Sequence, residues 1–177
     1  MSDDDTMHAL GSKSETMGQI MAARLANLRM ARGFHNKGDQ KGLMGALATM
    51  GDQSLAVDVL GALNSTPGYY TLETAAVATG LCEGMLLSEH DRYKAVAMAT
   101  VGILTKSFAQ LINSTREASP SAYGVDLSME ERLERCNSTY QGIMACKGRI
   151  QSLLGGDPEV SKKAHHTIGL IEQAFGR

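Results

Sequence analysis

Apolar side chains recur every three or four residues along almost the whole chain, the spacing that places them on one face of an α-helix. The longest such pattern runs from about Asp91 to Arg116 and would form a helix roughly 40 Å long at 1.5 Å per residue. No segment is a persuasive strand. We therefore expect an all-α fold of about seven helices, arranged as stacked antiparallel hairpins of the armadillo or HEAT kind or as a bundle.

Polar caps, glycines and prolines divide this pattern into helices. Ser12 with Glu15, and Ser128 with Glu131, form capping boxes that predict two helix starts. Helix ends, caps and loops are further expected at residues 36–38, at Asp39, Thr71 and Asp157, and at residues 64–68 and 118–127.

The apolar residues that follow Ser12 keep the same spacing, and they include two of the 11 methionines of the chain (Met17, Ile20, Met21, Leu25, Leu28 and Phe34). We expect the methionines to fill gaps in the core rather than to form a groove for peptides. Glycines inside predicted helices, among them Gly142, either permit close helix packing or reflect an only moderately stable fold.

The length of 177 residues is that of one domain with a real core. The first residues are rich in aspartate, which predicts an acidic, flexible N-terminus over residues 1–15. Residues 16–177 are then expected to form a single helical domain.

Several classes of function are disfavoured by what the sequence lacks. A net charge of −2 and the absence of interleaved aromatic and basic residues argue against nucleic-acid binding. No apolar run reaches the roughly 18–20 residues of a membrane span, and the acidic start is the reverse of a signal peptide. Three cysteines without a CxxC pair indicate reduced thiols in the cytosol.

No motif for catalysis, metal or cofactor binding is recognisable either. The adjacent His165 and His166 would point about 100° apart on a helix, with no carboxylate or cysteine in a supporting position. Phosphate-binding glycine loops and hydrolase or zinc motifs do not occur. We therefore expect a protein that is not an enzyme and that needs neither metal nor cofactor.

The small net charge is the sum of blocks of opposite sign. Residues 1–17 carry −3, residues 18–50 carry +4, residues 51–91 carry −6 and residues 92–118 carry +3. In the basic block, Arg24, Arg29 and Arg32 lie on the first predicted helix, and Lys37 and Lys41 follow it. This block is either an ordinary solvated face or a patch for an acidic partner.

Four segments, in this order and spacing, resemble one known family. The first contains Arg24-Leu25-Ala26-Asn27-Leu28, Arg32-Gly33-Phe34 and Lys37-Gly38-Asp39, and the second is Asp58-Val59-Leu60. The third is Ser88-Glu89-His90-Asp91-Arg92-Tyr93, and the most extensive runs from Gly124 to Asn137, ahead of Tyr140. Over roughly residues 18–154 the chain is similar to the C-terminal helical domain of the regulatory, WD-repeat-bearing subunit of katanin, here without the propeller.

The resemblance implies a non-catalytic module that binds the N-terminal domain of katanin's catalytic AAA subunit. In the family this pairing supports microtubule binding and severing and recruits spindle-pole and microtubule minus-end proteins. It implies a cytoplasmic, cytoskeletal location at microtubules, the centrosome or basal body, or the spindle pole. The alternative is a stand-alone helical scaffold for an unrelated cytoskeletal partner.

Two groups of residues are expected to carry these roles. We expect Arg24, Asn27, Arg29 and Arg32, with Lys37 and Lys41, to face the partner or the filament. Tyr93 is either an apolar anchor with a polar tip or a half-buried core aromatic. A last group is expected to hold the 118–127 loop as a structural motif rather than to contact a partner (Glu131, Arg132, Arg135 and Asn137).

Overall fold

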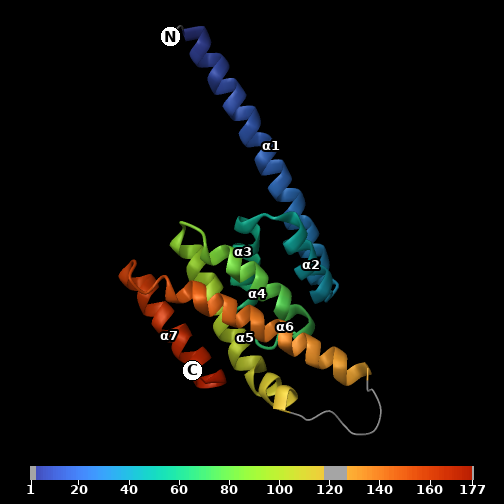
Figure 1. Cartoon of the computed structure of the whole chain (residues 1–177). Coiled ribbons are helices and arrows are strands. Elements are labelled where there is room, and N and C mark those ends of the chain that lie inside the picture. Colours follow the sequence, from blue (N-terminus) through green and yellow to red (C-terminus); the bar gives the residue numbers. More distant parts are fainter. Residues whose placement is uncertain (1–2, 118–126, 177) are drawn as a thin grey trace.

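The computed structural model describes residues 3–117 and 127–176, and this part of the chain is all-α, as predicted, with seven helices and no strand. The helices are α1 (Asp3–Asn36), α2 (Gln40–Met50), α3 (Gln53–Leu63), α4 (Leu72–Leu86), α5 (Asp91–Glu117), α6 (Leu127–Gln151) and α7 (Pro158–Phe175). Helices α2 to α7 form a compact body, from which α1 projects as a long rod (Figure 1).

The four C-terminal helices form the centre of the body, and consecutive helices alternate in direction. Thr79 of α4 lies beside Cys146 of α6, and Glu83 lies beside Arg149, so α4 and α6 are parallel. Helix α7 runs alongside α5, where the Asn113 side chain near the end of α5 donates to the Ala174 carbonyl near the end of α7. Helices α4 and α6 thus run in the same direction, as do α5 and α7, which is the arrangement expected when sequence neighbours pack as antiparallel pairs.

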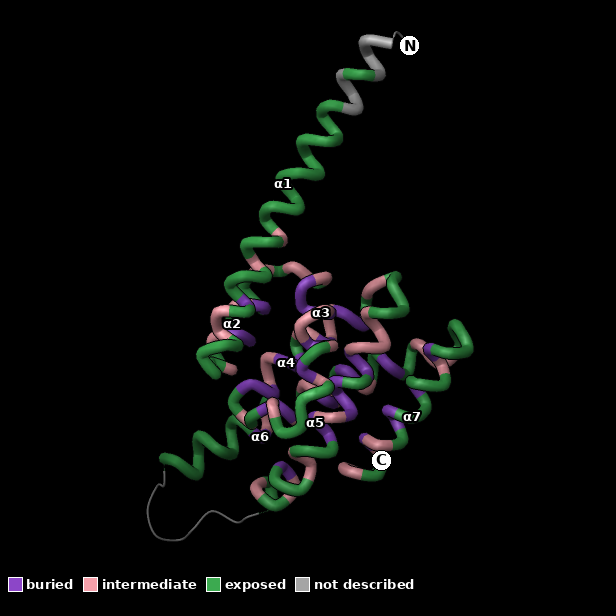
Figure 2. The backbone as a smooth tube through the Cα atoms, turned by 180° about the vertical axis from the view of Figure 1, so that it is seen from behind, coloured by how far each residue is buried: buried purple, intermediate pink, exposed green. Residues whose placement is uncertain are grey.

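The core lies between these helices, and α1 contributes almost nothing to it. The largest fully buried side chains come from α2 to α7 (Leu43, Met44, Leu47, Leu55, Leu60, Met85, Met98, Leu104, Ile112, Ile143, Ile150 and Ile171). Cys82, Cys136 and Cys146 are buried among them as free thiols. From α1, only Ala31 is buried in the part of that helix whose side chains the structure describes (Figure 2).

Helices α4 and α6 approach each other closely where Gly142 meets Thr79. A methyl group added at Gly142 would lie 2.7 Å from the Thr79 Cβ atom, well inside contact distance. The Cys146 thiol donates to the Thr79 carbonyl at 3.4 Å in the same contact. At this position, a helical glycine permits close packing, whereas the space around Gly148 on the same helix is open.

Most helix boundaries agree with the sequence pattern because local hydrogen bonds determine them. The Asp39 carboxylate accepts from the Gly42 N–H at 2.7 Å, and Thr71 and Asp157 cap α4 and α7. Gly38 has φ +69°, a left-handed conformation that ends α1. Helix α6 begins at Leu127, one residue before the expected cap at Ser128, and the loop expected at 118–127 lies almost wholly outside the described residues.

The expected start of the first helix at Ser12 is wrong. Helix α1 begins at Asp3 and continues through Ser12, whose carbonyl accepts from the Thr16 hydroxyl at 2.9 Å within the helix. The capping pattern is overridden because the preceding residues are themselves helical. The helix thus crosses the boundary expected at residues 15–16, and the division of the chain into those two parts stays a prediction.

Helix α5 is long and apolar enough to span a membrane by length and composition. Half of its most apolar 18-residue segment, however, is buried inside the fold. Helices α3, α4, α6 and α7 all pack against it. A core helix of a helical domain has the same composition, so this feature assigns no membrane role.

We predict that Gly142→Ala destabilises the fold by about 1–3 kcal/mol, because the added methyl group must displace the buried Thr79 side chain. The matched control is Gly148→Ala on the same helix, where the space is open and alanine should stabilise by about 0.5–1 kcal/mol. Urea unfolding measures both changes. A neutral Gly142→Ala would contradict the close packing of α4 on α6.

Candidate protein-binding site

Helix α1 is supported by the body over only its second half. It packs against α2 and α3, and residues 11–23, the free half of α1, are exposed throughout. Figures 1 and 2 show this half extending away from every other helix. Isolated helices of this length are only marginally stable in water. A partner packed against the exposed half of α1 would therefore stabilise it.

An apolar stripe runs along the exposed side of α1. It consists of Met17, Met21, Leu25 and Leu28, spaced four, four and three residues apart so that they lie on one face. All four are exposed, with Met21 at 59% and Leu28 at 37%. Ile20, at 58%, lies at the edge of the stripe.

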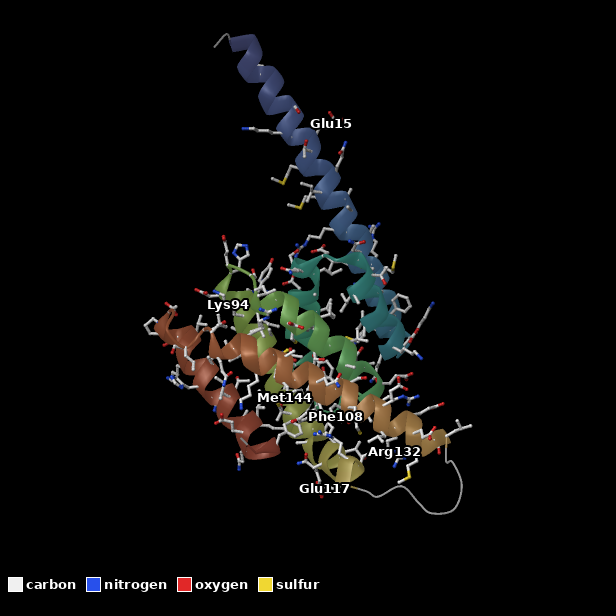
Figure 3. The ribbon with its side chains drawn as sticks, in the orientation of Figure 1. Glu15, Lys94, Phe108, Glu117, Arg132 and Met144 are labelled. Atoms are coloured by element: carbon white, nitrogen blue, oxygen red, sulfur yellow. The ribbon has the colours of Figure 1, made fainter. Side chains whose placement is uncertain are left out.

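The expectation that the methionines mostly fill the core is therefore wrong for α1. Met44, Met85 and Met98 are core residues, whereas Met7, Met17, Met21 and Met30 are more than half exposed. The spacing that predicts an inward face is present, but no element of the described chain covers it. Figure 3 shows apolar side chains standing free along the projecting helix.

At Leu28, the end of the stripe nearest the body, an apolar groove lies between α1 and α3. Its volume is about 290 Å³, and Leu28, Arg32 and His35 form its α1 wall. Val59 and Leu63 belong to the opposite wall from α3. The stripe and the groove share Leu28, so together they form one continuous apolar surface along α1 and into the body.

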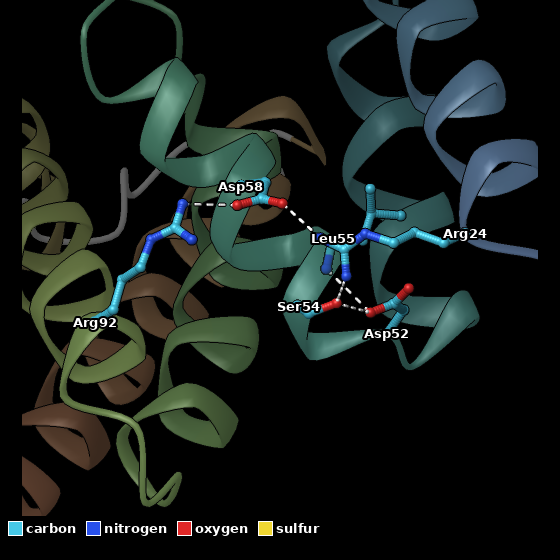
Figure 4. A network of polar contacts seen from close by, with 6 residues as sticks. All are labelled: Arg24, Asp52, Ser54, Leu55, Asp58 and Arg92. Carbon is cyan, nitrogen blue, oxygen red and sulfur yellow. Dashed lines mark hydrogen bonds and ion pairs between the residues drawn. The ribbon is translucent and has the colours of Figure 1, made fainter. Parts of the chain in front are cut away.

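A network of polar contacts attaches α1 to the body at this level (Figure 4). The Asp58 carboxylate of α3 pairs with Arg24 of α1 at 2.6 Å and with Arg92 of α5 at 2.8 Å. Arg24 also contacts the Ser54 hydroxyl, which donates to Asp52 at 2.8 Å. Arg24, expected to face a partner, thus joins three helices of its own chain through Asp58.

Asp52 completes this network as the N-cap of α3. Partial burial would raise the pKa of Asp52, but it is outweighed by hydrogen bonds from the Leu55 N–H and the Ser54 hydroxyl and by the nearby Arg24 charge. The net effect lowers the pKa of Asp52 below its ordinary value. The ionised carboxylate is therefore part of what positions α1.

The charge blocks of the sequence largely neutralise one another in the fold. Besides the Asp58 pairs, Lys41 pairs with Glu73 at 2.7 Å, and Arg149 pairs with Glu83 at 3.4 Å. The bond from Lys41 holds the pKa of Glu73 below its ordinary value. The acidic block of residues 51–91 thus binds cations from three other parts of the chain.

Three cations of the basic block remain without an ion pair in the described part of the chain. Arg29, Arg32 and Lys37 are exposed, and Arg29 and Arg32 lie on α1 next to the apolar stripe. Asn27 is half-buried. The basic face expected from the sequence is reduced to these three cations, and it borders an apolar surface that sequence reasoning assigned to the core.

Tyr93 and the group around Arg132 lie elsewhere in the fold. Tyr93, in the first turn of α5, is half-buried against the core, and its ring centroid is 5.0 Å from that of His90. Glu131 and Arg135 form an exposed pair at 3.3 Å on α6, where Arg132 is also exposed and Asn137 is half-buried. The loop they were expected to hold lies outside the described residues, so both roles stay predictions.

Reactive groups are scarce in the described regions. Within residues 3–117 and 127–176 no three His, Cys, Asp or Glu side chains are grouped so as to hold a metal. Burial, with a smaller effect from Glu83, raises the pKa of Cys146 to about 12, and burial likewise raises the pKa of Cys82. These thiols stay protonated at neutral pH, which suits a packing role.

The fold and this surface define a class: an all-α domain with a projecting helix whose apolar stripe and unpaired cations are suited to binding another protein. The family model of the con80 domain of katanin matches residues 12–169. The chain therefore belongs to the katanin con80 domain family, which confirms the resemblance seen in the sequence.

Individual relatives agree with this membership. The katanin p80 WD40 repeat-containing subunit B1 of Danio rerio is 29% identical over 143 residues, which is 81% of this chain and 20% of the relative. That of Gallus gallus is 27% identical over 175 residues, 97% of this chain and 26% of the relative. An Arabidopsis thaliana homologue of the subunit is 30% identical over 171 residues, which is 97% of this chain and 14% of the relative. The chain thus spans between 14% and 26% of the length of these relatives.

We predict that stability depends on ionisation of Asp52. Because its pKa is lower in the folded state, its contribution is complete above the unfolded value of about 3.9 and is lost as the pH falls through the folded pKa. Asp52→Asn keeps the cap but cannot ionise. Wild type should be more stable than this variant by less than about 1 kcal/mol at pH 7, because the network is partly exposed.

That difference in the free energy of unfolding should close as the pH is lowered from about 5 towards 2. Asp52→Ala, which also loses the cap, should be less stable than Asp52→Asn by about 1 kcal/mol across the range. Urea unfolding at each pH measures these values. A gap between wild type and Asp52→Asn that is independent of pH would contradict the role given to the carboxylate charge.

Proposed function

We propose that this chain is a non-catalytic regulatory module that pairs with the N-terminal domain of the katanin catalytic AAA subunit. The observation that carries the proposal is the exposed apolar stripe of α1, bordered by unpaired cations. Family membership supports katanin as the context, because the relatives are named as katanin p80 subunits.

The physical character of the surface suits a helical partner with acidic edges. A helix of the partner would lie along α1, bury Met17, Met21 and Leu25, and place its end in the groove at Leu28. Arg29 and Arg32 would meet acidic side chains at the edge of that interface, which adds specificity and speeds association. Arg24 attaches α1 to the body through Asp58, and Asn27 remains a proposed partner contact.

We further propose that the complex acts on microtubules in the cytoplasm and supports severing or its targeting. Tubulin surfaces are acidic, and Arg29, Arg32 and Lys37 would provide a salt-sensitive attraction to them. Spindle-pole or minus-end proteins are further partners in this proposal, and the centrosome, basal body or spindle pole are the corresponding locations. Tyr93, at the start of α5, is a second place for an apolar anchor.

The alternative is a helical scaffold that uses the same stripe for an unrelated cytoskeletal protein. Such a scaffold would keep the requirement for Met21 and Leu25 but would not recognise katanin. The partner's identity, rather than the surface, distinguishes the two functions.

We predict that Met21→Asp weakens binding to the isolated N-terminal domain of a katanin catalytic subunit at least about tenfold, equivalent to about 1.4 kcal/mol, because a charge replaces an apolar side chain that the partner would bury. Met30→Asp is the matched control. Met30 is also exposed, at 52%, but lies nine residues or two and a half turns from Met21, on the opposite side of α1.

Isothermal titration calorimetry with the purified domains measures both affinities. Equal losses from the two variants would contradict the stripe as the interface. Absence of binding by the wild-type chain at micromolar concentration would instead contradict the katanin partner and favour the scaffold.

We predict that the joint change of Arg29, Arg32 and Lys37 to glutamate weakens microtubule binding severalfold at low salt, because it reverses three unpaired charges. The control is Lys41→Glu with Glu73→Lys, which exchanges the two charges of an internal pair and leaves the net charge unchanged. Co-sedimentation with microtubules across a salt series measures the effect. If the triple variant and the wild type lost binding equally as salt rises, the basic face would have no role in it.

A further inference from the structure

An open groove follows the line of contact between α5 and α7, and we call it the α5–α7 groove. It consists of two hollows along the same pair of helices, one of about 500 Å³ and one of about 570 Å³. Leu170 packs against Gly102 at their boundary, with its Cδ1 atom 3.5 Å from where a Cβ atom at Gly102 would lie. From Ala95 to Glu117 the groove is roughly 33 Å long at 1.5 Å per residue.

The shape of the groove suits a third helix. On both α5 and α7 the lining residues recur mainly at intervals of three or four, so each helix presents one continuous face to the groove. The lining is mainly apolar and includes four alanines that are exposed or half-buried (Ala95, Ala99, Ala109 and Ala174). Such small side chains let the backbone of another helix approach closely, and its larger side chains can fill the two hollows.

The charges of the groove select an acidic partner. Lys162 and Lys163 of α7 and Lys106 of α5 line its middle and are exposed. None of the three forms an ion pair within residues 3–117 and 127–176. Glu159 and Glu117 lie at the two ends, at the start of α7 and the end of α5. An apolar helix face flanked by carboxylates in its middle turns is therefore complementary to this groove, whereas one flanked by cations is repelled.

We propose that the α5–α7 groove binds an amphipathic helix of another protein, with an apolar stripe flanked by aspartate or glutamate in its middle turns. The groove shares no residue with the apolar stripe of α1. Helix α1 packs against α2 and α3, whereas α7 packs against α5 and α6 and lies across the body from α1 (Figure 1). One chain can therefore hold two partners at once, and the second site is independent of the function proposed above.

Two synthetic helical peptides of about 20 residues, a length that the groove accommodates, serve as probes. Both have leucine and alanine along one face. The acidic peptide has glutamate beside this face in its middle turns, and the basic peptide has lysine at the same positions. Fluorescence anisotropy of each labelled peptide with the full chain measures the affinity. The acidic peptide is expected to bind at least about tenfold more tightly than the basic one.

Variants of the chain locate the binding. Ala99→Trp is expected to weaken binding of the acidic peptide at least about tenfold, because the indole ring fills the groove. The matched control is Ala26→Trp, at another exposed alanine on α1, and it should leave the affinity unchanged. The joint change of Lys106, Lys162 and Lys163 to glutamate should reverse the preference between the two peptides. Circular dichroism of each variant checks that the helical fold is retained.

Each other outcome overturns the proposal. Absence of binding at millimolar concentration, or equal binding of both peptides, would show that the groove does not select an acidic helix. So would a preference that survives the three lysine changes. Loss of binding in Met21→Asp but not in Ala99→Trp would place the peptide on the apolar stripe of α1.

A second copy of the chain is the remaining occupant to test. If sedimentation equilibrium showed a wild-type dimer that Ala99→Trp dissociates, the groove would be filled by another copy and the proposal would be wrong. No katanin subunit is present in any of these experiments. Their failure would therefore leave the proposed pairing with the catalytic subunit untouched.

Discussion

The carboxylate of Asp58 determines how α1 leaves the body. It accepts from Arg24 of α1 and from Arg92 of α5 while itself belonging to α3, so one side chain joins three helices. The pairs are about one-third exposed on the Arg24 and Asp58 side, which limits their energy but not their geometry. The direction of the projecting helix, and with it the placement of the stripe and groove, depends on this junction.

Local features of the fold could be predicted from the sequence, and long-range ones could not. The caps at Asp39, Thr71 and Asp157 depend on hydrogen bonds to residues two or three positions away, so a short window of sequence contains them. The Ser12 pattern failed because a capping box is also compatible with the interior of a longer helix. Spacing placed Met17, Met21, Leu25 and Leu28 on one face of α1, but spacing alone cannot say whether these residues meet the same chain or another one.

The candidate site illustrates the same limit. Of the six residues expected on the basic face, Arg24 and Lys41 are in ion pairs within the chain, because acids far away in sequence reach them. Arg29, Arg32 and Lys37 keep free charges. Together with Met21 and Leu25, which are exposed in the structure, they form a surface suited to binding another protein. Family membership gives this surface a context in katanin, whose p80 relatives match the chain over most of its length.

A helix supported at one end behaves as a lever. The part of α1 that precedes Arg24, residues 3–23, is about 20 residues long and extends roughly 30 Å beyond its support at 1.5 Å per residue. A tilt of 10° at the Asp58 junction therefore displaces the tip by about 5 Å, as far as a full turn of helix. A partner bound to the tip alone would be displaced by the same amount when α1 tilts. A partner that also enters the groove beside Leu28 would be held at two points and in a single orientation.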